Sequence, residues 1–336
     1  MGDGIAGQSI MSMADLATPM SIRVAASLDL AEHTDGDGAT LGDLVAATGA
    51  FAPALDRLLA HLVTVGVFEL DPESERYRPS RLGQQLKADA PEGIKPLLDI
   101  RCAGGRAELA FVDLLDTIVS GSPAYPLRYG RDFWADLDTE PQLRESFDAQ
   151  MNWRYRIQAI QIAERYDWGR FTDIFDVGGG DGQLLATILE AHPTVRGRVL
   201  DLPPTAAAAT KRLSAAGLSD RATSVAGNFF DPIPTGAAAY ILSDVLHDWD
   251  DDHARAILEN CARAAGADAA VVVIEAAAGR GTSTAFDLFM LMCFGGRERT
   301  IVQLTELAAQ CNLRLEGVAP ISDGRTALEF RSTVLV

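Results

Sequence analysis

The sequence predicts an α/β protein in which a mostly parallel, doubly wound sheet follows a smaller helical domain of winged-helix type. First, an apolar run at 174–177 leads through the glycine-rich segment 178–182 into an apolar helical pattern at 184–192. Strand, glycine turn and helix in this order begin a doubly wound sheet. Second, strand and helix patterns alternate after residue 192. Third, the first 100 residues contain a helix, turn, helix and hairpin pattern.

The N-terminal elements follow one another closely. Apolar residues recur at helical spacing over 14–31, and a Gly/Asp turn follows them. Two further helices are expected over 41–50 and 52–66, and then a hairpin with a short helix over 67–86. This combination suggests a winged-helix module, a fold that often reads DNA.

The charge of this module argues against DNA binding. Its first 100 residues contain 15 Asp or Glu against 7 Lys or Arg, and the expected recognition helix 53–66 offers Arg57 and His61. The whole chain has a formal net charge of −18, which repels phosphates at long range. The apolar residues of the helix favour instead a module that packs against a second subunit, so we expect a homodimer.

The composition fits a globular enzyme that acts on a small molecule. The chain has 336 residues, of which 48% are hydrophobic and 23% charged. The four cysteines, Cys102, Cys261, Cys293 and Cys311, are widely spaced, which predicts reduced thiols. The N-terminus lacks a basic region before an apolar core, and no apolar run approaches the length of a bilayer. We therefore expect a cytoplasmic protein with no membrane partner.

A helical connector is expected between the two domains. It is interrupted by the Ser/Gly/Pro loop 120–130, and its last part is predicted to form two helices hinged near Pro141. The expected division is 1–100 for the winged-helix domain, 101–168 for the connector and 169–336 for the sheet domain. Phe147 and Met151 lie four residues apart on one helical face, so they either face a pocket or pack in a core.

The remaining strands and helices follow in alternation. Strands are expected to end at Asp201, near Asn228, around Ser243 and at Glu275, and a helix with an acidic start is expected at 251–265. Further helices are predicted at 205–216, near 284–293 and around 303–312, and two terminal strands at 314–322 and 327–336. A final hairpin would make the edge of the sheet antiparallel.

Polar side chains stand at the carboxyl ends of four of these strands: Asp176, Asp201, Asn228 and Glu275. Because the ends of parallel strands meet at one edge of a sheet, these residues can surround one ligand. Asp201 lies 19 positions beyond Gly182, where an acidic side chain can accept hydrogen bonds from a ribose, although a turn or capping aspartate before a proline is also possible.

The glycine spacing favours S-adenosylmethionine over NAD. The spacing is Gly178-x-Gly180-x-Gly182, and Gln183 stands where the nicotinamide fingerprint has its third glycine or alanine. After the next strand, an aromatic at Phe229 can lie against an adenine face while the amide of Asn228 meets its edge. The two adjacent phenylalanines could equally belong to the core.

The motifs DVGGGDG, VLDLP, GNFFDPIP, LSDVLHDWDDD, VVVIEA and FGGRERT occur in this order. As a set, over nearly the whole chain, they resemble the plant-caffeate-type family of S-adenosylmethionine-dependent O-methyltransferases, in particular bacterial enzymes that methylate aromatic polyketide hydroxyls. The resemblance implies a Rossmann-like catalytic domain, a winged-helix dimerisation domain, S-adenosylhomocysteine as product and no metal. The five histidines show no metal-ligand spacing.

The resemblance also implies the residues that bind the cofactor. Gly178 and Gly180 would bound its methionine part, Asp201 would hold the ribose, and Ser243 would lie beside it. Many relatives have an acidic residue at the Asn228 position, and plant members have a lysine at the Ser243 position. The full set implied for cofactor binding is Asp176, Gly178, Gly180, Asp201, Leu202, Asn228, Phe229, Phe230, Ser243 and Trp249.

His247 matches the general base of the family, with Asp248 beside it, and Glu275 and Glu298 match the acidic pair that flanks it. A phenol with a pKa near ~10 is a poor nucleophile at neutral pH, whereas an imidazole with a pKa near ~6.5 can take its proton. One carboxylate would fix the imidazole tautomer. Met290 and Phe294 would line an apolar acceptor pocket together with Phe147 and Met151.

The predicted function is methylation of a phenolic hydroxyl on a polycyclic aromatic natural product, such as a naphthoate or anthraquinone-type polyketide. One alternative keeps fold and cofactor but carries out hydroxylation or decarboxylation, and the intact His247, Glu275 and Glu298 argue against it. A nicotinamide oxidoreductase is opposed by Gln183 and a DNA-binding regulator by the charge.

Overall fold

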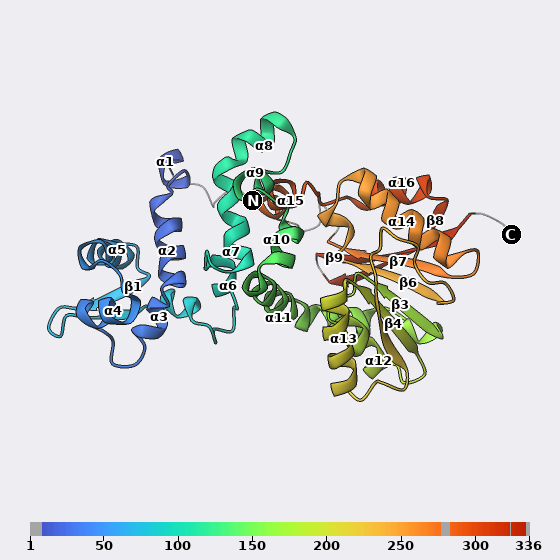
Figure 1. Ribbon diagram of the computed structural model, residues 1–336, viewed down its shortest axis with the longest axis horizontal. Coiled ribbons are helices and arrows are strands. Elements are labelled where there is room, and N and C mark those ends of the chain that lie inside the picture. The colour runs from blue at the N-terminus through green and yellow to red at the C-terminus, as the bar shows by residue number, and fades with distance from the viewer. Residues whose placement is uncertain (1–8, 277–282, 323, 334–336) are drawn as a thin grey trace. The chain divides into compact units, whose positions relative to one another are not determined.

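The computed structural model describes residues 9–276, 283–322 and 324–333, and it forms two compact units (Figure 1). The first unit comprises residues 1–109 and 134–150, and the second comprises 110–133 and 151–336. The connector expected at 101–168 therefore contributes to both units, and its limits stay a proposal. Among the described residues, no helix combines the length and the apolar character that a bilayer span requires.

The first unit contains the predicted winged-helix module. Its elements are α1 (Ile10–Met13), α2 (Ala17–Ser27), α3 (Leu30–His33), α4 (Leu41–Thr48), α5 (Ala52–Thr64), β1 (Phe68–Asp71), β2 (Arg76–Pro79), η1 (Gly83–Leu86), α6 (Lys95–Leu98) and α7 (Ala103–Glu108). Strands β1 and β2 pair antiparallel as the wing. Leu30, Leu44, Leu59 and Leu62 are fully buried and form the core of the module with Phe68.

Local sequence explains where these helices begin and end. A capping box between Thr40 and Asp43 starts α4, and Gly49 ends it in the left-handed conformation. The single helix expected over 14–31 is instead broken into α2 and α3, because Asp29 adopts a φ of 53°. An aspartate tolerates this conformation better than most residues, but the helical pattern alone does not reveal it.

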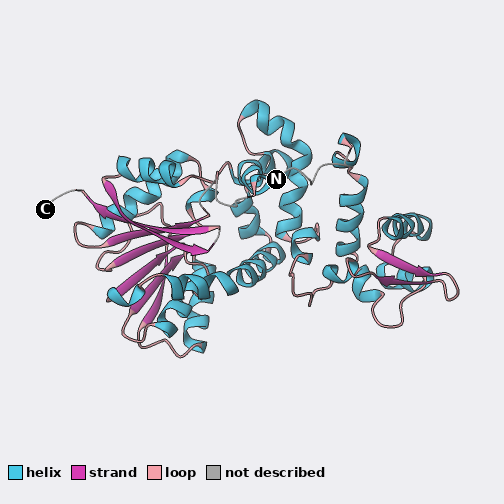
Figure 2. Ribbon diagram, turned by 180° about the vertical axis from the view of Figure 1, so that it is seen from behind, coloured by secondary structure: helices cyan, strands magenta, loops and turns pink. Residues whose placement is uncertain are grey.

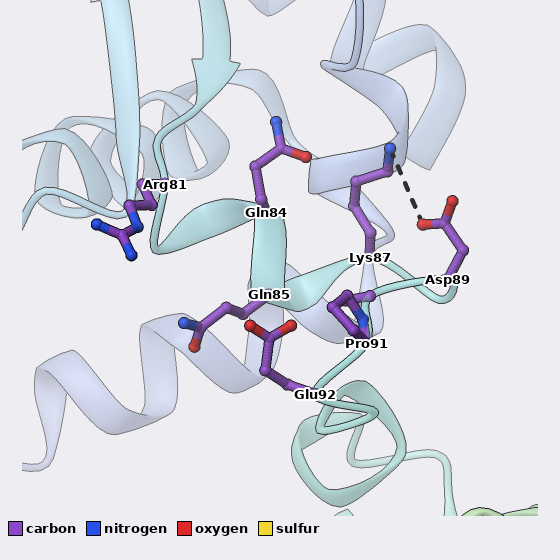
Figure 3. A pocket seen from close by; sticks show the side chains of 8 residues that line it. Arg81, Gln84, Gln85, Lys87, Asp89, Pro91 and Glu92 are labelled. Atoms are coloured by element: carbon purple, nitrogen blue, oxygen red, sulfur yellow. Dashed lines mark ion pairs between the residues drawn. The ribbon is translucent and has the colours of Figure 1, made fainter.

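The first unit also has a surface pocket of about 360 Å³ next to η1 (Figure 3). Lys87 contributes to it and forms ion pairs with Asp35 and, at 3.9 Å, with Asp89. The pocket contains none of the residues predicted for the functional site. The lining residues are Arg81, Gln84, Gln85, Lys87, Asp89, Ala90, Pro91 and Glu92.

The second unit contains the doubly wound sheet, which Figure 2 shows with helices on both faces. The strand order is β5-β4-β3-β6-β7-β9-β8. The first five strands pair parallel, and β9 pairs antiparallel with β7 and β8, so the predicted topology is confirmed. The strands are β3 (Asp173–Val177), β4 (Arg196–Asp201), β5 (Ala222–Ala226), β6 (Ala239–Ser243), β7 (Ala270–Glu275), β8 (Leu313–Ser322) and β9 (Arg325–Ser332).

Two apolar cores lie on the two faces of this sheet. One joins the C-terminal half of α11 to α12 and α13 and contains Trp168 and Leu185. The other joins α14 and α16 to the opposite face and contains Phe175 and Tyr240. Residues 134–150, which form most of α10 (Phe133–Thr139) and the start of α11 (Pro141–Arg165), belong to the first unit. The other helices are η2 (Leu109–Asp113), α8 (Leu114–Ser120), α9 (Ala124–Tyr129), η3 (Trp168–Arg170), α12 (Gln183–Ala191), α13 (Pro203–Ala215), η4 (Leu246–Asp248), α14 (Asp251–Ala265), α15 (Thr284–Phe294) and α16 (Ile301–Gln310).

Most element boundaries agree with the sequence prediction. Helices α10 and α11 meet at Pro141 as expected, and β4, β6 and β7 end at Asp201, Ser243 and Glu275. Strand β5 ends earlier, at Ala226, so the expected end near Asn228 is wrong by two residues. Asn228 instead begins a tight turn, in which its side-chain oxygen accepts a hydrogen bond from the amide of Phe230.

Candidate active site

The loop after β3 is shaped by its glycines. Gly178, Gly180 and Gly182 have φ values of 71°, 62° and 79°, which favour glycine. A Cβ on Gly179 would lie 2.5 Å from the carboxyl carbon of Asp176, so only glycine fits there. A Cβ on Gly180 would meet nothing within 4 Å. The loop therefore packs tightly on the side of the sheet and leaves open space above Gly180.

Asp201 fixes this loop from the neighbouring strand. One of its carboxylate oxygens accepts a hydrogen bond of 2.9 Å from the amide of Gly180, and the other accepts one of 2.7 Å from the amide of Leu202. The amide of Gly178 also donates to the carbonyl of Leu200 at 2.8 Å. The structure thus brings Asp201, Leu202 and the glycine loop together, as the strand-end argument predicted. Binding of a ribose by Asp201 stays a prediction.

Two polar side chains beside the loop are buried without a hydrogen-bond partner among the described residues. They are Asp176, with both carboxylate oxygens, and Ser243, with its hydroxyl. Burial, and secondly the charge of Asp201, raise the pKa of Asp176 to about 7. Buried polar groups normally have partners, so these two are candidates for contact with a bound ligand.

The raised pKa of Asp176 predicts a pH-dependent effect on stability. A carboxyl group whose pKa is higher in the folded state contributes stability below its unfolded value of 3.8, and this contribution is lost as the pH rises to about 7. At pH 8 the loss corresponds to roughly 4 kcal/mol. We therefore expect Asp176→Asn to raise the melting temperature of the ligand-free protein more at pH 8 than at pH 5. Equal changes at both pH values in calorimetry would contradict the prediction.

Aromatic residues form one wall near the glycine loop. The rings of Phe229 and Phe230 lie 5.0 Å apart, and both contact Trp249 edge to face, at 5.9 Å and 4.8 Å. A Cβ on Gly178 would lie 3.4 Å from the ring of Phe229. The two phenylalanines therefore pack with Trp249 and also reach the loop. Their contact with an adenine, and that of the exposed Asn228, stays a prediction.

His247 lies in η4, directly beyond the carboxyl end of β6, and is 6% exposed. Its Nδ1 is 3.1 Å from Glu275 and 3.2 Å from Glu298, and its Nε2 is 3.4 Å from Asp248. The contacts at Nδ1 are within ion-pair distance but are not aligned as hydrogen bonds. The four residues predicted to be catalytic thus lie together, although Glu298 is 51 positions from His247 in the chain.

This cluster changes the proton affinity of its members. Burial alone would lower the pKa of His247, but Glu275, Asp248 and Glu298 raise it well above its ordinary value. Burial raises the pKa of Asp248 to about 7, although the imidazole acts in the opposite direction. Perturbed pKa values in a compact cluster are typical of functional sites.

Backbone and arginine contacts hold the cluster in place. The other oxygen of Glu275 accepts a hydrogen bond of 2.9 Å from the amide of Leu246, and the amide of Glu298 donates to Asp287 at 2.8 Å. The buried guanidinium of Arg299 donates to the carbonyls of Leu246 and Trp249 at 2.7 and 2.8 Å. These bonds fix the backbone on both sides of His247.

An ion pair missed by the sequence reasoning lies beneath this loop. Asp244, with a φ of 52°, accepts hydrogen bonds from Arg325 at the start of β9 and from Tyr155 on α11. Asp244, His247 and Glu275 have a spacing that could hold a metal ion. The guanidinium of Arg325 already neutralises the charge of Asp244 in a buried ion pair, so this donor set does not fit a metal.

The residues predicted for the acceptor pocket fall in different parts of the chain. Met290 is buried on α15, and Phe294 contacts Phe133 edge to face at 5.0 Å. Met151 belongs to the second unit, whereas Phe147 belongs to the first and contacts Trp134 there. The sequence reasoning did not include Phe286, whose ring lies 5.9 Å from that of His247. It begins an aromatic face on α15 by stacking on Phe289 at 6.1 Å.

Comparison with known proteins identifies the family. Residues 111–313 match the O-methyltransferase domain family. The 2,7-dihydroxy-5-methyl-1-naphthoate 7-O-methyltransferase of Streptomyces carzinostaticus is 47% identical over 96% of this chain and 97% of its own length. The aclacinomycin 10-hydroxylase of Streptomyces purpurascens is 39% identical over 97% of this chain and 88% of its own length.

A solved structure agrees over almost the whole fold. It is a neocarzinostatin-biosynthesis O-methyltransferase in complex with S-adenosylmethionine and 2-hydroxy-5-methyl naphthoic acid. The TM-score is 0.93 at 47% identity, covering 97% of this chain and 99% of that chain. The fold is thus that of an S-adenosylmethionine-dependent methyltransferase. The chain belongs to the O-methyltransferase family, in the branch that contains natural-product enzymes, as the sequence motifs predicted.

Proposed function

We propose that this protein transfers the methyl group of S-adenosylmethionine to a phenolic hydroxyl of a polycyclic aromatic natural product, with a naphthoate as the favoured type of acceptor. The observation that carries the proposal is the cluster of His247 with Glu275 and Glu298 beyond the carboxyl ends of β6 and β7. The relative that methylates a naphthoate and the solved relative with a bound naphthoic acid support the acceptor class.

The residues around the glycine loop suit the cofactor. The open space at Gly180 and the unsatisfied oxygens of Asp176 and Ser243 are what a polar ligand would fill. We assign Asp201 to the ribose and Phe229 to the adenine. When bound, S-adenosylmethionine supplies an electrophilic methyl group that needs no metal for its activation.

The chain's own residues then act on the acceptor oxygen. Nε2 of His247 accepts the phenolic proton, because Nδ1 faces Glu275 and Glu298. These carboxylates fix the tautomer and stabilise the imidazolium that forms. Burial of the cluster excludes water, and the firm backbone of η4 keeps the base in position. Catalysis is mainly positioning and proton removal.

The electrostatics of His247 predict a pH profile. The base must be neutral, and its pKa is raised by the surrounding carboxylates. We therefore expect kcat/KM to rise with pH through an apparent pKa above 6.5, and this rise is the acidic limb of the pH profile. Glu275→Gln should move this limb to lower pH and reduce kcat. Asp250→Asn, which changes an exposed carboxylate paired with His253, is the control and should leave the limb in place. A limb that does not move in Glu275→Gln would argue against the assigned base.

One alternative deserves a direct test because a 39% identical relative is a hydroxylase. The purified protein should be incubated with S-adenosylmethionine and a panel of hydroxylated naphthoates and anthraquinones. The masses of the products should then be measured by mass spectrometry. The proposal expects a gain of one CH₂ unit and an equal amount of S-adenosylhomocysteine. A gain of one oxygen, or loss of carbon dioxide, would establish the alternative instead.

We also propose that the protein is a homodimer formed through its N-terminal region. Leu59 and Leu62 of α5 are buried in their own unit, so only the less buried part of the apolar run on this helix, Leu58, Ala60, Val63 and Val65, is left to face a partner. Ile10 and Met11 of α1 are 76% and 77% exposed, and Met13 is 64% exposed. Light scattering should give twice the chain mass, and Met11→Glu with Met13→Glu should reduce it. The cytoplasmic location stays a prediction.

A further inference from the structure

Arg154 on α11 lies close enough to the proposed site to contact the acceptor. Its guanidinium carbon lies 5.0 Å from the centre of the Phe286 ring, and Phe286 lies 5.9 Å from His247. The guanidinium is therefore no more than about 11 Å from the centre of the His247 ring. A two-ring aromatic molecule can contact two groups within this limit, Arg154 with one substituent and His247 with another.

The guanidinium of Arg154 acts on nearby carboxylates only at longer range. Among the described residues, no carboxylate lies within ion-pair distance of its guanidinium, and its recorded contact is the face of Phe286. The neighbouring cations differ in this respect. Arg325 forms an ion pair with Asp244, and Arg299 donates to Asp251 and to two backbone carbonyls. Arg154 therefore retains its hydrogen-bond donors for a ligand.

The surroundings of His247 make such a cation necessary for an anionic acceptor. Glu275, Glu298 and Asp248 all lie within 3.4 Å of the imidazole, and these acidic groups would repel a carboxylate. Arg154 acts electrostatically on Asp248 and Asp244, so its charge reaches the same region. A guanidinium binds a carboxylate through two parallel hydrogen bonds, which fixes orientation as well as affinity.

We propose that Arg154 is a specificity-determining residue that pairs with the carboxylate of an aromatic hydroxy acid and so presents the phenolic hydroxyl of that acid to His247. The proposal rests on the methyltransferase function proposed above and adds the acceptor's charged group and its partner. Phe286 would then serve twice, since it supports the guanidinium on its face and offers apolar ring surface with Phe289 to the acceptor.

The test compares an acid with its neutral ester. The acceptors are 2,7-dihydroxy-5-methyl-1-naphthoic acid and its methyl ester, and KM and kcat are measured for wild type, Arg154→Met and Arg154→Lys. In wild type, KM should be lower for the acid than for the ester. Arg154→Met should raise KM for the acid roughly 10- to 100-fold, with little change for the ester, because a charge-assisted hydrogen bond is lost. Arg154→Lys should fall between them, because lysine keeps the charge but not the paired donors.

The control is Arg156→Met, two residues along the same helix. Its side chain is exposed and points to a different face of α11, so the acid and ester constants should stay at wild-type values. Equal KM values for acid and ester in wild type, or an equal loss for both in Arg154→Met, would overturn the assignment of Arg154 and leave the methyltransferase proposal standing. Absence of methyl transfer to either acceptor by the wild type would overturn both. If Arg154→Met folds poorly, Arg154→Lys carries the test: a higher KM for the acid alone supports the assignment, and equal changes for acid and ester overturn it.

Discussion

Replacing His247 with alanine is expected to lower kcat by a factor on the order of 10² to 10⁴, the usual contribution of a positioned general base. In the proposed mechanism, Nε2 of His247 takes the acceptor proton while Glu275 and Glu298 lie beside Nδ1. Turnover should be measured by mass spectrometry, at saturating S-adenosylmethionine and over a range of acceptor concentrations. Turnover within a few-fold of wild type would reject His247 as the base.

The affinity for S-adenosylhomocysteine separates this loss from a general collapse of the site. The groups proposed to hold the cofactor lie around the glycine loop and Asp201, so the dissociation constant measured by calorimetry should change little. His33→Ala is the matched control, because His33 is an exposed histidine at the end of α3 in the first unit. Its kcat should remain near the wild-type value.

The residues at the strand ends could be predicted because they follow from the length of each apolar run and from the parallel topology of the sheet. A buried parallel strand ends where its apolar run ends, and neighbouring parallel strands end at one edge of the sheet. Asp176, Asp201 and Glu275 therefore appear at the expected edge. Asn228 lies two residues beyond the end of β5, because its side chain forms a local turn instead of continuing the strand.

Contacts between segments that are distant in the chain could not be predicted from any local pattern in the sequence. Asp244 and Arg325 are 81 residues apart, and nothing in either local pattern indicates that they form a buried ion pair. From the sequence alone, Arg154 is one of several charged residues on a long polar helix. Its guanidinium is seen to lie near the proposed site only because the structure places Phe286 beside it. A set of related sequences could have revealed both pairs through covariation.

The packing of the aromatic residues also explains why the motif resemblance could not decide the role of each of them. Phe229 packs against Phe230 and Trp249 and also reaches the glycine loop, so one side chain belongs to the core and borders the proposed cofactor site. The alternatives left open from the sequence, core or adenine contact, are therefore not exclusive. Phe147 contacts Trp134 within the first unit, and its part in acceptor binding stays a prediction.

Gly296→Ala is expected to have the second large effect, because the backbone after α15 passes directly over η4. A Cβ at this position would lie 2.1 Å from the carbonyl oxygen of His247, and that oxygen already accepts a hydrogen bond of 2.9 Å from the amide of Arg297. Neither group can move without shifting the imidazole or Glu298. A displacement of about 1 Å in a catalytic group can reduce turnover ~100-fold, and overpacking costs typically about 1–3 kcal/mol of stability.

Gly295→Ala provides the control at the adjacent position. Gly295 has a φ of 75° at the end of α15, so alanine there is strained, but its Cβ would meet Pro123 at 3.4 Å and not His247. Both variants should melt at a lower temperature than wild type, and kcat should fall about 100-fold in Gly296→Ala and much less in Gly295→Ala. Equal losses of kcat in the two variants would mean that the contact with His247 is not what matters. Because Glu298 follows Gly296 by two residues, the same close approach that excludes a side chain also brings the second carboxylate to the imidazole.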